Sequence, residues 1–224
     1  MQRIVLAAIA AASMIAATPL AAAKLPDTWD GLYRVDSKKM EGVYLLPQAD
    51  FRTYTKVILS PTDIAFRKNW QRDQNQENLA NRVDDSDARR ILDSARDGFQ
   101  DIFRKAYEKA GYQVVTTPGP DVLRILTAVV NLDVQAPDTM SPGITRTYSR
   151  DAGSATLAVE ARDSLTGALL ARVVDAQELD NVGVYIRNRA TNSMAFEQVF
   201  EDWAKRSAEG LTKLKAMSPI DPAK

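Results

Sequence analysis

Arginine and tyrosine side chains are concentrated in two segments that we expect to be loops, 136–153 and 180–191. They are Arg146, Tyr148 and Arg150 in the first segment, and Tyr185, Arg187 and Arg189 in the second. Guanidinium groups bind carboxylate and phosphate through paired hydrogen bonds, and tyrosine adds a flat contact surface. If the two segments converge, they form a candidate patch for an anion or a partner. Alternatively, these are solvated loop charges that Asp151 and Asp180 partly neutralise.

The sequence contains no histidine and no cysteine among its 224 residues. This absence excludes disulfides, thiolate nucleophiles, Cys/His zinc sites and Ser-His-Asp machinery. The remaining catalytic options are paired carboxylates, a Ser-Lys pair, tyrosine, or a metal site built from oxygen ligands. With 29 acidic residues, candidate carboxylate pairs occur throughout the chain, so none of them is informative.

The known catalytic and phosphate-binding motifs are also missing. The chain has no glycine-rich phosphate loop, no nucleophile-elbow motif and no HExxH motif. The acidic cluster of Asp84, Asp85 and Asp87 lacks the glycine and the terminal glutamate of a calcium loop, which favours helix capping. We therefore predict no catalytic residue, no cofactor and no metal, and a protein that is not an enzyme.

The charge balance argues against nucleic acid as a partner. Lys+Arg and Asp+Glu are 29 each, and the chain is 45% hydrophobic and 26% charged, as is ordinary for a globular domain. Removal of residues 1–23 takes away Arg3 and leaves 28 cations against 29 anions, a net charge of −1. A nearly neutral chain offers no general attraction for a polyanion.

Residues 1–23 are expected to be a secretory signal peptide. Arg3 precedes an apolar, alanine-rich run of about 14 residues, which is too short to span a bilayer comfortably. The small residues that end at Ala23 form a cleavage pattern, so that Lys24 becomes the first mature residue. We therefore expect an exported periplasmic protein with no transmembrane span after signal removal.

Two amphipathic helices are expected, at 84–110 and 192–217. In the first, apolar or small residues recur at the i, i+3, i+4, i+7 spacing. The stripe consists of Ile91, Ala95, Phe99, Ile102, Ala106 and Ala110, with Leu92, Phe103 and Tyr107 beside it. Asp84 offers a capping acceptor at the start, and Gly111 can adopt the left-handed conformation that ends a helix. Gly98 is in mid-helix, where close approach to a strand would explain a glycine.

The remaining periodic segments are expected to be strands. Strands are predicted at 56–68, 112–116, 121–134, 154–163 and 168–179, with a short edge strand at 43–46. Along 121–134, one face is expected to carry Val122, Leu126, Ala128, Val130, Leu132 and Val134. Leu123, Ile125 and Val129 make the other face partly buried too, as in a central strand. Asp163–Gly167 is expected to be a hairpin turn. Residues 69–83 are expected to be a polar connector, in which Trp70 either covers the core or makes an exposed contact.

These elements predict an α/β fold, an α+β sandwich with two long helices on one face of a mixed, largely antiparallel sheet of about five strands. The domain covers residues 55–217, with an irregular aromatic-containing lead at 24–54 and a tail at 218–224. Strands 121–134 and 168–179 run in the same direction. The two loops that carry the arginines and tyrosines therefore emerge at one end of the sheet.

Several stretches of the chain resemble a bacterial envelope family catalogued as domain of unknown function 3313. They are WDGLYRVDSKKMEGVYLLPQADFRTYTKVILSPTDIAF, KAGYQVV, PDVLRILTAVVNLDV and TLAVEARDSLTGALLARVVD, and the likeness spans Trp29 to Leu214. The resemblance implies an exported bacterial protein with no assigned activity. Members are often lipoproteins with a cysteine at the mature start. This sequence has Ala-Ala-Ala-Lys there instead, which favours a periplasmic form without a lipid anchor.

Three functions remain open at this point. The first is a non-enzymatic module that binds or supports an unknown envelope protein or ligand. The second is a carboxylate-based hydrolase of cell-wall material, which would need a deep cleft with two acids about 5–10 Å apart. The third is an oligomeric envelope-assembly subunit, which an exposed edge strand would favour.

Overall fold

A computed structural model describes residues 25–77, 82–134, 147–187 and 189–221, and for 147–152, 179–187 and 189–195 it describes the backbone alone. The strands are β1 (Thr28–Trp29), β2 (Leu32–Val35), β3 (Gly42–Leu45), β4 (Lys56–Leu59), β5 (Asp63–Phe66), β6 (Gln113–Val114), β7 (Val122–Val134), β8 (Thr147–Asp163) and β9 (Leu169–Arg187). The helices are α1 (Trp70–Glu77), α2 (Asp85–Lys109) and α3 (Arg189–Met217). The predicted signal peptide and its predicted cleavage point, Ala23 and Lys24, lie outside the described residues.

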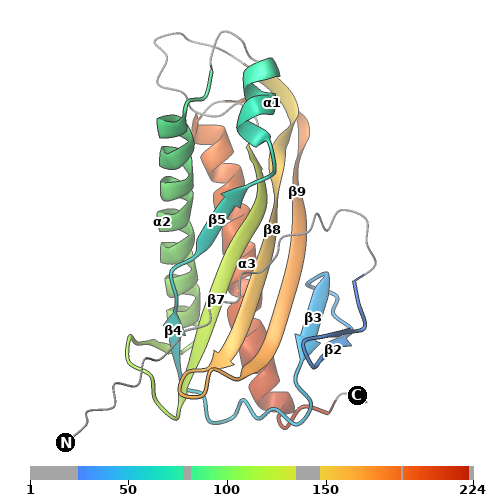
Figure 1. Ribbon diagram of the computed structural model, residues 1–224, viewed down its shortest axis with the longest axis vertical. Coiled ribbons are helices and arrows are strands. Elements are labelled where there is room, and N and C mark those ends of the chain that lie inside the picture. Colours follow the sequence, from blue (N-terminus) through green and yellow to red (C-terminus); the bar gives the residue numbers. More distant parts are fainter. Residues whose placement is uncertain (1–24, 78–81, 135–146, 188, 222–224) are drawn as a thin grey trace, which may run out of the picture.

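One sheet contains all nine strands, in the order β1-β2-β3-β9-β8-β7-β4-β6, with β5 also paired to β7. The pairs β4–β6, β4–β7 and β5–β7 are parallel, and the other pairs are antiparallel. The long strands β7, β8 and β9 run along most of the molecule (Figure 1). A mixed, largely antiparallel sheet is therefore confirmed, and β7 and β9 run in the same direction as expected.

The expected count of about five strands was wrong. The supposedly irregular lead contains β1, β2 and β3, and β3 pairs with Ala171–Val174 of β9. The expected strand 56–68 is two strands, because the chain leaves β7 around Pro61 and returns to it as β5. The sequence pattern predicted β3 as the short edge strand at 43–46, but β1 and β2 contain too few residues to show a clear alternation and were not predicted.

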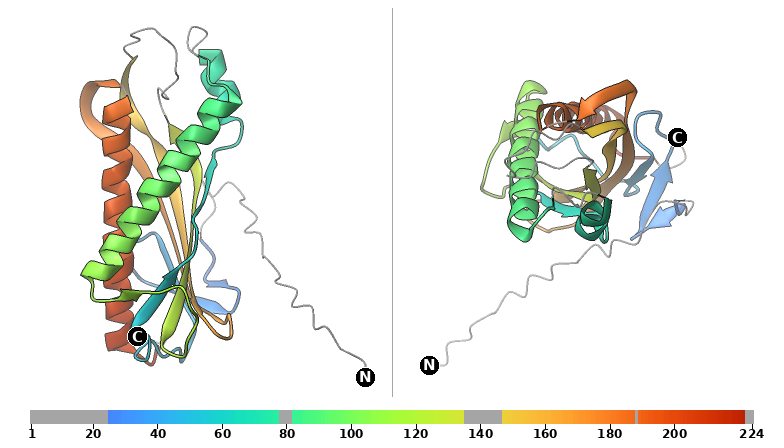
Figure 2. Two further views of the ribbon diagram at one scale, coloured as in Figure 1. Left: turned by 90° about the vertical axis from the view of Figure 1, so that its left-hand side faces the viewer. Right: turned by 90° about the horizontal axis from the view of Figure 1, so that it is seen from above.

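The long helices α2 and α3 pack side by side on one face of the sheet, as expected (Figure 2). Phe99 of α2 and Phe200 of α3 meet edge to face with ring centroids 5.1 Å apart, and the Tyr107 hydroxyl lies 2.8 Å from Ser207 Oγ. The buried face of α2 centres on Phe99, Phe103 and Tyr107, whereas Ala110 at the end of the expected stripe is exposed.

Helix α2 begins and ends as the sequence predicts. The Asp84 carboxylate accepts hydrogen bonds from the backbone N–H groups of Ser86 and Asp87, both at 2.8 Å. The Asp87 carboxylate accepts one in return from the Asp84 N–H at 3.4 Å. This reciprocal arrangement satisfies N–H groups that the first helical turn leaves free. Gly111 follows with φ of +91°, the left-handed conformation expected of a helix stop.

Helix α1 was not expected, because residues 69–83 carry no apolar periodicity. Its anchor is Trp70, which is only 1% exposed and stacks on Phe66 with ring centroids 3.7 Å apart. Of the two interpretations of Trp70, packing on the core is therefore the correct one.

Strand β7 changes its inward face at a β-bulge. Asn131 has φ of +54°, and the pairing with β8 shifts between Val130 and Asp133. Consequently the core receives Leu123, Ile125, Val129, Leu132 and Val134. The expected face, which placed Val130 with Leu132 and Val134, was wrong because the extra residue reverses the alternation. The bulge also turns Asp133 toward α1.

Candidate functional site

The described residues of the predicted arginine and tyrosine patch lie on strands and at the start of a helix, so the expectation of loops was wrong for 147–153 and 180–187. Tyr148 and Arg150 lie in β8, Arg187 is the last residue of β9, and Arg189 is the first of α3. Arg146 lies outside the described residues. The backbones of the two segments are neighbours, because Thr147 pairs with Arg187. Whether their side chains form one patch stays a prediction.

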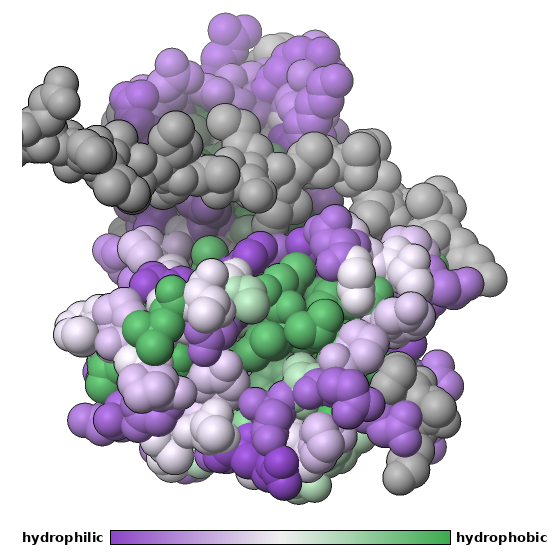
Figure 3. All heavy atoms as spheres, turned by 60° about the horizontal axis from the view of Figure 1, so that its bottom comes forward, coloured by the Kyte–Doolittle hydropathy of each residue, from purple (hydrophilic) through white to green (hydrophobic). Residues whose placement is uncertain are grey.

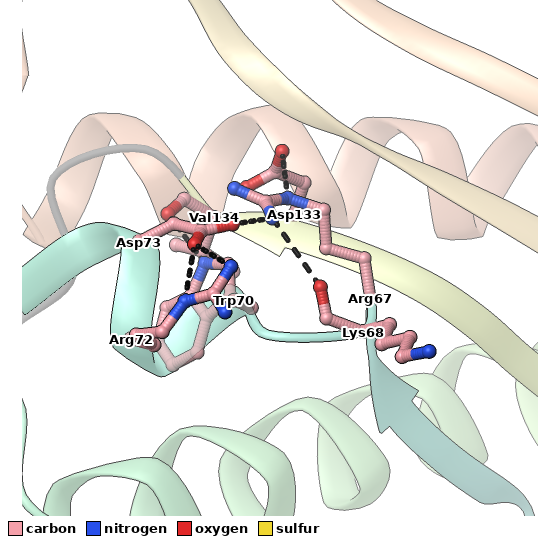
Figure 4. Close-up of polar contacts among 7 residues, drawn as sticks. All are labelled: Arg67, Lys68, Trp70, Arg72, Asp73, Asp133 and Val134. Atoms are coloured by element: carbon pink, nitrogen blue, oxygen red, sulfur yellow. Dashed lines mark hydrogen bonds and ion pairs between the residues drawn. The ribbon is translucent and has the colours of Figure 1, made fainter.

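A polar cluster occurs where α1 meets the end of β7. We call it the distal cluster; it consists of Arg67, Trp70, Asp73 and Asp133 (Figure 4). Arg67 donates from Nε to Asp133 Oδ2 at 2.7 Å and from Nη1 to Asp73 Oδ2 at 2.6 Å. Trp70 Nε1 donates to the backbone carbonyl of Val134 at 3.1 Å. One guanidinium therefore joins the chain before α1, the helix itself and the bulged strand.

Charge pairing in the distal cluster favours the ionised carboxylate of Asp73. Hydrogen bonds from Arg67 and then Arg72 hold the pKa of Asp73 below its usual value, and Asp73 in turn raises the pKa of Arg67. Asp133 Oδ1 is buried and accepts no hydrogen bond from the described residues. A buried acceptor without a donor is uncommon, and it can bind an N–H or O–H group.

The distal cluster and the predicted patch lie near one another along the paired strands. Val134 pairs with Gly153, and β8 continues from there to Thr147. Sequence reasoning missed the cluster because Arg67, Asp73 and Asp133 belong to three separate elements. The bulge that brings them together leaves only a faint signal, a shift in the alternation after Val130.

Two clefts are open to solvent elsewhere. The first, of about 240 Å³, lies between α2 and the edge of the sheet at β4 and is lined by Leu59, Thr62, Phe103, Ile125 and Thr127, among others. Its one acidic residue, Asp101, is ion-paired with Arg104 and Lys105. The second, of about 520 Å³, lies at the carboxyl ends of α2 and α3 and has no acidic residue in its lining.

The end of the molecule drawn at the bottom of Figure 1 has an apolar character. Seen from that end, apolar residues gather at the centre of the surface within a border of hydrophilic ones (Figure 3). Leu165, in the turn between β8 and β9, and Met217, the last residue of α3, are each 60% exposed. Both belong to this end of the molecule.

A buried ionic network attaches β1 to the outer face of the sheet. Glu160 Oε1 accepts from Arg172 Nε at 3.0 Å and Nη2 at 2.6 Å, and Arg172 Nη1 donates to Asp30 Oδ2 at 2.8 Å. The Arg172 guanidinium lies 4.3 Å from the centroid of the Trp29 ring. Every charged group of this network has a partner, so its role is to hold the first strands in place.

Comparison with known protein families identifies the family of this chain. The family model described as "Protein of unknown function (DUF3313)" matches residues 23–207. The chain belongs to this family. The resemblance drawn from the sequence is thereby confirmed for DUF3313. No curated protein matches.

Solved structures that are similar to this DUF3313 chain include the following two. Protein XCC0632 from Xanthomonas campestris, of family DUF330, is 12% identical, with 78% of this chain and 91% of that chain covered and a TM-score of 0.46. A PelC dodecamer from Paraburkholderia phytofirmans is 10% identical, with 73% and 97% covered and a TM-score of 0.35. This level of similarity is too low to indicate the function of the DUF3313 chain.

The described residues of the DUF3313 chain contain neither a membrane-spanning helix nor a cluster of metal ligands. None of the helices there combines the length and the apolar character needed to cross a bilayer. No group of three or more acidic side chains that could hold a metal ion occurs within the same residues.

Proposed function

We propose that this protein is an exported module of the bacterial cell envelope that binds or supports another envelope component without catalysing a reaction. Export rests on the signal pattern at 1–23, and the envelope setting rests on what the family resemblance implies. The chemistry available for binding is that of arginine, lysine, tyrosine and their paired carboxylates.

The observation that supports this proposal is that, among the described residues, the two clefts contain only one carboxylate in their linings, and that this carboxylate is already ion-paired. A glycoside hydrolase needs two acids that face each other across a cleft. In the described part of the chain, the smaller cleft is lined by one acid, Asp101, which is already paired with two cations, and the larger cleft is lined by none. Binding therefore fits these surfaces better than hydrolysis does.

Export is tested with the chain expressed from its own start in a bacterial host. The periplasmic fraction should contain a protein whose mass and N-terminal sequence begin at Lys24. The variant Ala23→Leu should accumulate uncut, because a bulky residue replaces the small one at the cleavage site. Recovery of the wild-type chain solely in the cytoplasm would reject the export part of the proposal.

Binding is tested by crosslinking in the periplasm, followed by affinity capture and identification of the captured components. The variant with Arg146, Arg150, Arg187 and Arg189 changed to serine tests the predicted patch. A control with Lys38, Lys105, Lys109 and Lys213 changed to serine removes the same charge elsewhere. We expect the arginine variant to lose an envelope component that the control retains. Turnover of a cell-wall fragment, without a captured component, would instead favour the hydrolase.

One observation favours the assembly subunit as a second candidate. Strand β3 covers only Ala171–Val174 of β9, and no strand of the described residues pairs with that edge from Ala176 to Arg187. An edge of this length can accept a strand from another chain. Sedimentation analysis distinguishes the candidates, because an assembly subunit has a mass in solution that is a multiple of the chain mass.

A further inference from the structure

The larger cleft lies at the base of the molecule, far along the sheet from the predicted arginine patch, and we call it the basal cleft. Its volume is about 520 Å³. Arg52 and Thr55 come from the segment before β4, Tyr112 follows the end of α2, and Thr212 and Lys215 come from the last turns of α3. Three segments that are far apart in sequence therefore build one concave surface with two cations and no acid.

Lys215 lines the basal cleft, and its ammonium group has N–H donors left for a ligand. Its Nζ donates to the backbone carbonyl of Tyr54 at 2.7 Å and lies 5.5 Å from the centroid of the Tyr112 ring. An ammonium group has three N–H donors, and this contact uses one of them. Within the described residues no carboxylate pairs with Lys215, so its charge is not neutralised by an ion pair.

Arg52 also lines the cleft, and only part of its guanidinium group is hydrogen-bonded. Its Nε and Nη2 donate to the Asp50 carboxylate, with Nη2 2.6 Å from Oδ2, whereas Nη1 has no hydrogen bond to the described residues. These bonds hold the pKa of Asp50 at about 2, so the carboxylate is ionised and offsets part of the arginine charge. The surplus positive charge of the cleft is therefore that of Lys215, and Arg52 adds directed donors.

The hydroxyl groups of the lining already have partners. Thr212 donates to the Ala208 carbonyl at 3.3 Å and lies 3.2 Å from the Tyr112 hydroxyl, and Thr55 donates to Asp121 at 3.2 Å. The unused capacity of the cleft thus belongs to its two cations. Together they select an anion with more than one oxygen acceptor, which a phosphate group provides.

A lysine near the end of a helix also has a purely structural use, because it offsets the negative end of the helix dipole. That role and the contact with Tyr54 explain why Lys215 is present. They do not explain the open volume beside it or the presence of Arg52 in the lining of the same volume.

We propose that the basal cleft binds the phosphate group of an envelope constituent between Arg52 and Lys215. The volume of the cleft exceeds that of a bare phosphate. It therefore has room, beside the Tyr112 side chain in its wall, for the sugar or glycerol that the phosphate carries. The source is either a phospholipid headgroup or a soluble phosphate ester. This site is separate from the predicted arginine patch, and the envelope origin of its ligand rests on the proposed function.

The test uses the mature full-length chain, with backbone amide shifts recorded by NMR during titration with inorganic phosphate, then with glycerol phosphate, at constant ionic strength. Saturable shifts are expected in residues 50–55, 110–112 and 212–216. The variants are Arg52→Gln, Lys215→Met and both together. The control is Lys213→Met, which removes an exposed charge from the same helix. Circular dichroism checks that each variant folds, and Arg52→Gln alone carries the test if Lys215→Met does not fold.

We expect each single variant to weaken phosphate binding about tenfold, because each removes charge-assisted hydrogen bonds, and the control to bind like the wild type. Cosedimentation with vesicles of phosphatidylglycerol, against vesicles of phosphatidylcholine alone, distinguishes the two sources. Binding to the anionic vesicles identifies a lipid headgroup, and binding to glycerol phosphate alone identifies a soluble ester. Absence of both, or equal binding by wild type and double variant, would overturn the proposal.

Discussion

At the scale of single residues, Asp175 is a polar centre beneath α3. It is 3% exposed. Its Oδ1 accepts from the Glu41 backbone N–H at 2.9 Å, and its Oδ2 accepts from Trp203 Nε1 at 2.8 Å. The carboxylate therefore joins β9, the helix and the segment before β3.

We predict that Asp175→Ala lowers the free energy of unfolding by about 3 kcal/mol, because each buried N–H left without an acceptor costs about 1–3 kcal/mol. Asp93→Ala is the control, since that carboxylate is 65% exposed and pairs only with Arg96. It should change stability by less than about 1 kcal/mol. Urea unfolding measures both, and equal effects would show that Asp175 is not a structural centre.

Two glycines give a matched pair of opposite predictions. A Cβ added at Gly98 of α2 meets nothing within 4 Å, so the interpretation that this glycine allows close approach to a strand was wrong. At Gly153, with φ of +135°, a Cβ would lie 1.8 Å from the Asp133 carbonyl oxygen.

Gly98→Ala should therefore raise the free energy of unfolding by about 1 kcal/mol, as expected for glycine in a helix interior. Gly153→Ala should lower it by more than that, because the backbone must move away from Asp133. Thermal unfolding of the two variants beside the wild type checks the signs. A loss of stability in Gly98→Ala would mean that the helix is not straight and open at this point.

At the scale of elements, the turn between β8 and β9 is held by the Asp163 carboxylate. Its Oδ1 accepts from the Thr166 N–H at 2.7 Å and from the Leu165 N–H at 3.1 Å, and its Oδ2 accepts from the Tyr54 hydroxyl at 2.9 Å. Burial alone would raise the pKa of Asp163, but the hydrogen bonds from Thr166, Tyr54 and Leu165 outweigh it and lower the pKa.

This lowered pKa predicts a loss of stability in acid. Because the folded pKa is below that of the unfolded chain, which is about 3.9 for Asp, the stabilisation is complete above that value. It disappears as the pH falls through the lower, folded pKa. Asp163→Asn should be less stable than the wild type at pH 7 and should lose less stability on acidification. Melting temperatures from pH 7 to pH 2 measure this, with the exposed Asp97→Asn as the control.

At the scale of the whole molecule, the first three strands are an extension attached to one edge of the sheet. Trp29 packs edge to face on Tyr44 with centroids 5.6 Å apart and covers Arg172. Leu25, which is 6% exposed, packs where a side chain at position 42 would otherwise lie. The chain is thus fixed to the sheet from the start of its described part.

We predict that Trp29→Ala increases the amide hydrogen exchange of β2 and β3 while that of α2 stays unchanged. The variant loses a cation–π contact worth about 0.5–2 kcal/mol together with its packing. Tyr33→Ala, which removes a side chain that is 48% exposed, is the control and should exchange like the wild type. Faster exchange throughout the sheet of Trp29→Ala would show that the extension is part of the cooperative core.

Much of the framework was predictable because its signals are local. The period of α2, the Asp84 cap and the Gly111 stop each depend on neighbouring residues, and each was confirmed. Helix α1 and the outer halves of β8 and β9 were missed. Their backbone hydrogen bonds form with any residue type, so a segment without regular alternation, such as 180–187, can extend a strand.

The sequence by itself determined the chemical limits of this protein. Without histidine and cysteine it has no thiolate, imidazole or disulfide chemistry, and its periodic segments require two long helices on one sheet. Only the tertiary structure decided which side chains meet. Asp133, which follows the bulge at Asn131, pairs with Arg67, and the end of α3 places Lys215 in the lining of the same cleft as Arg52. Such contacts depend on the register and length of distant elements, and these are set by the packing of the whole chain.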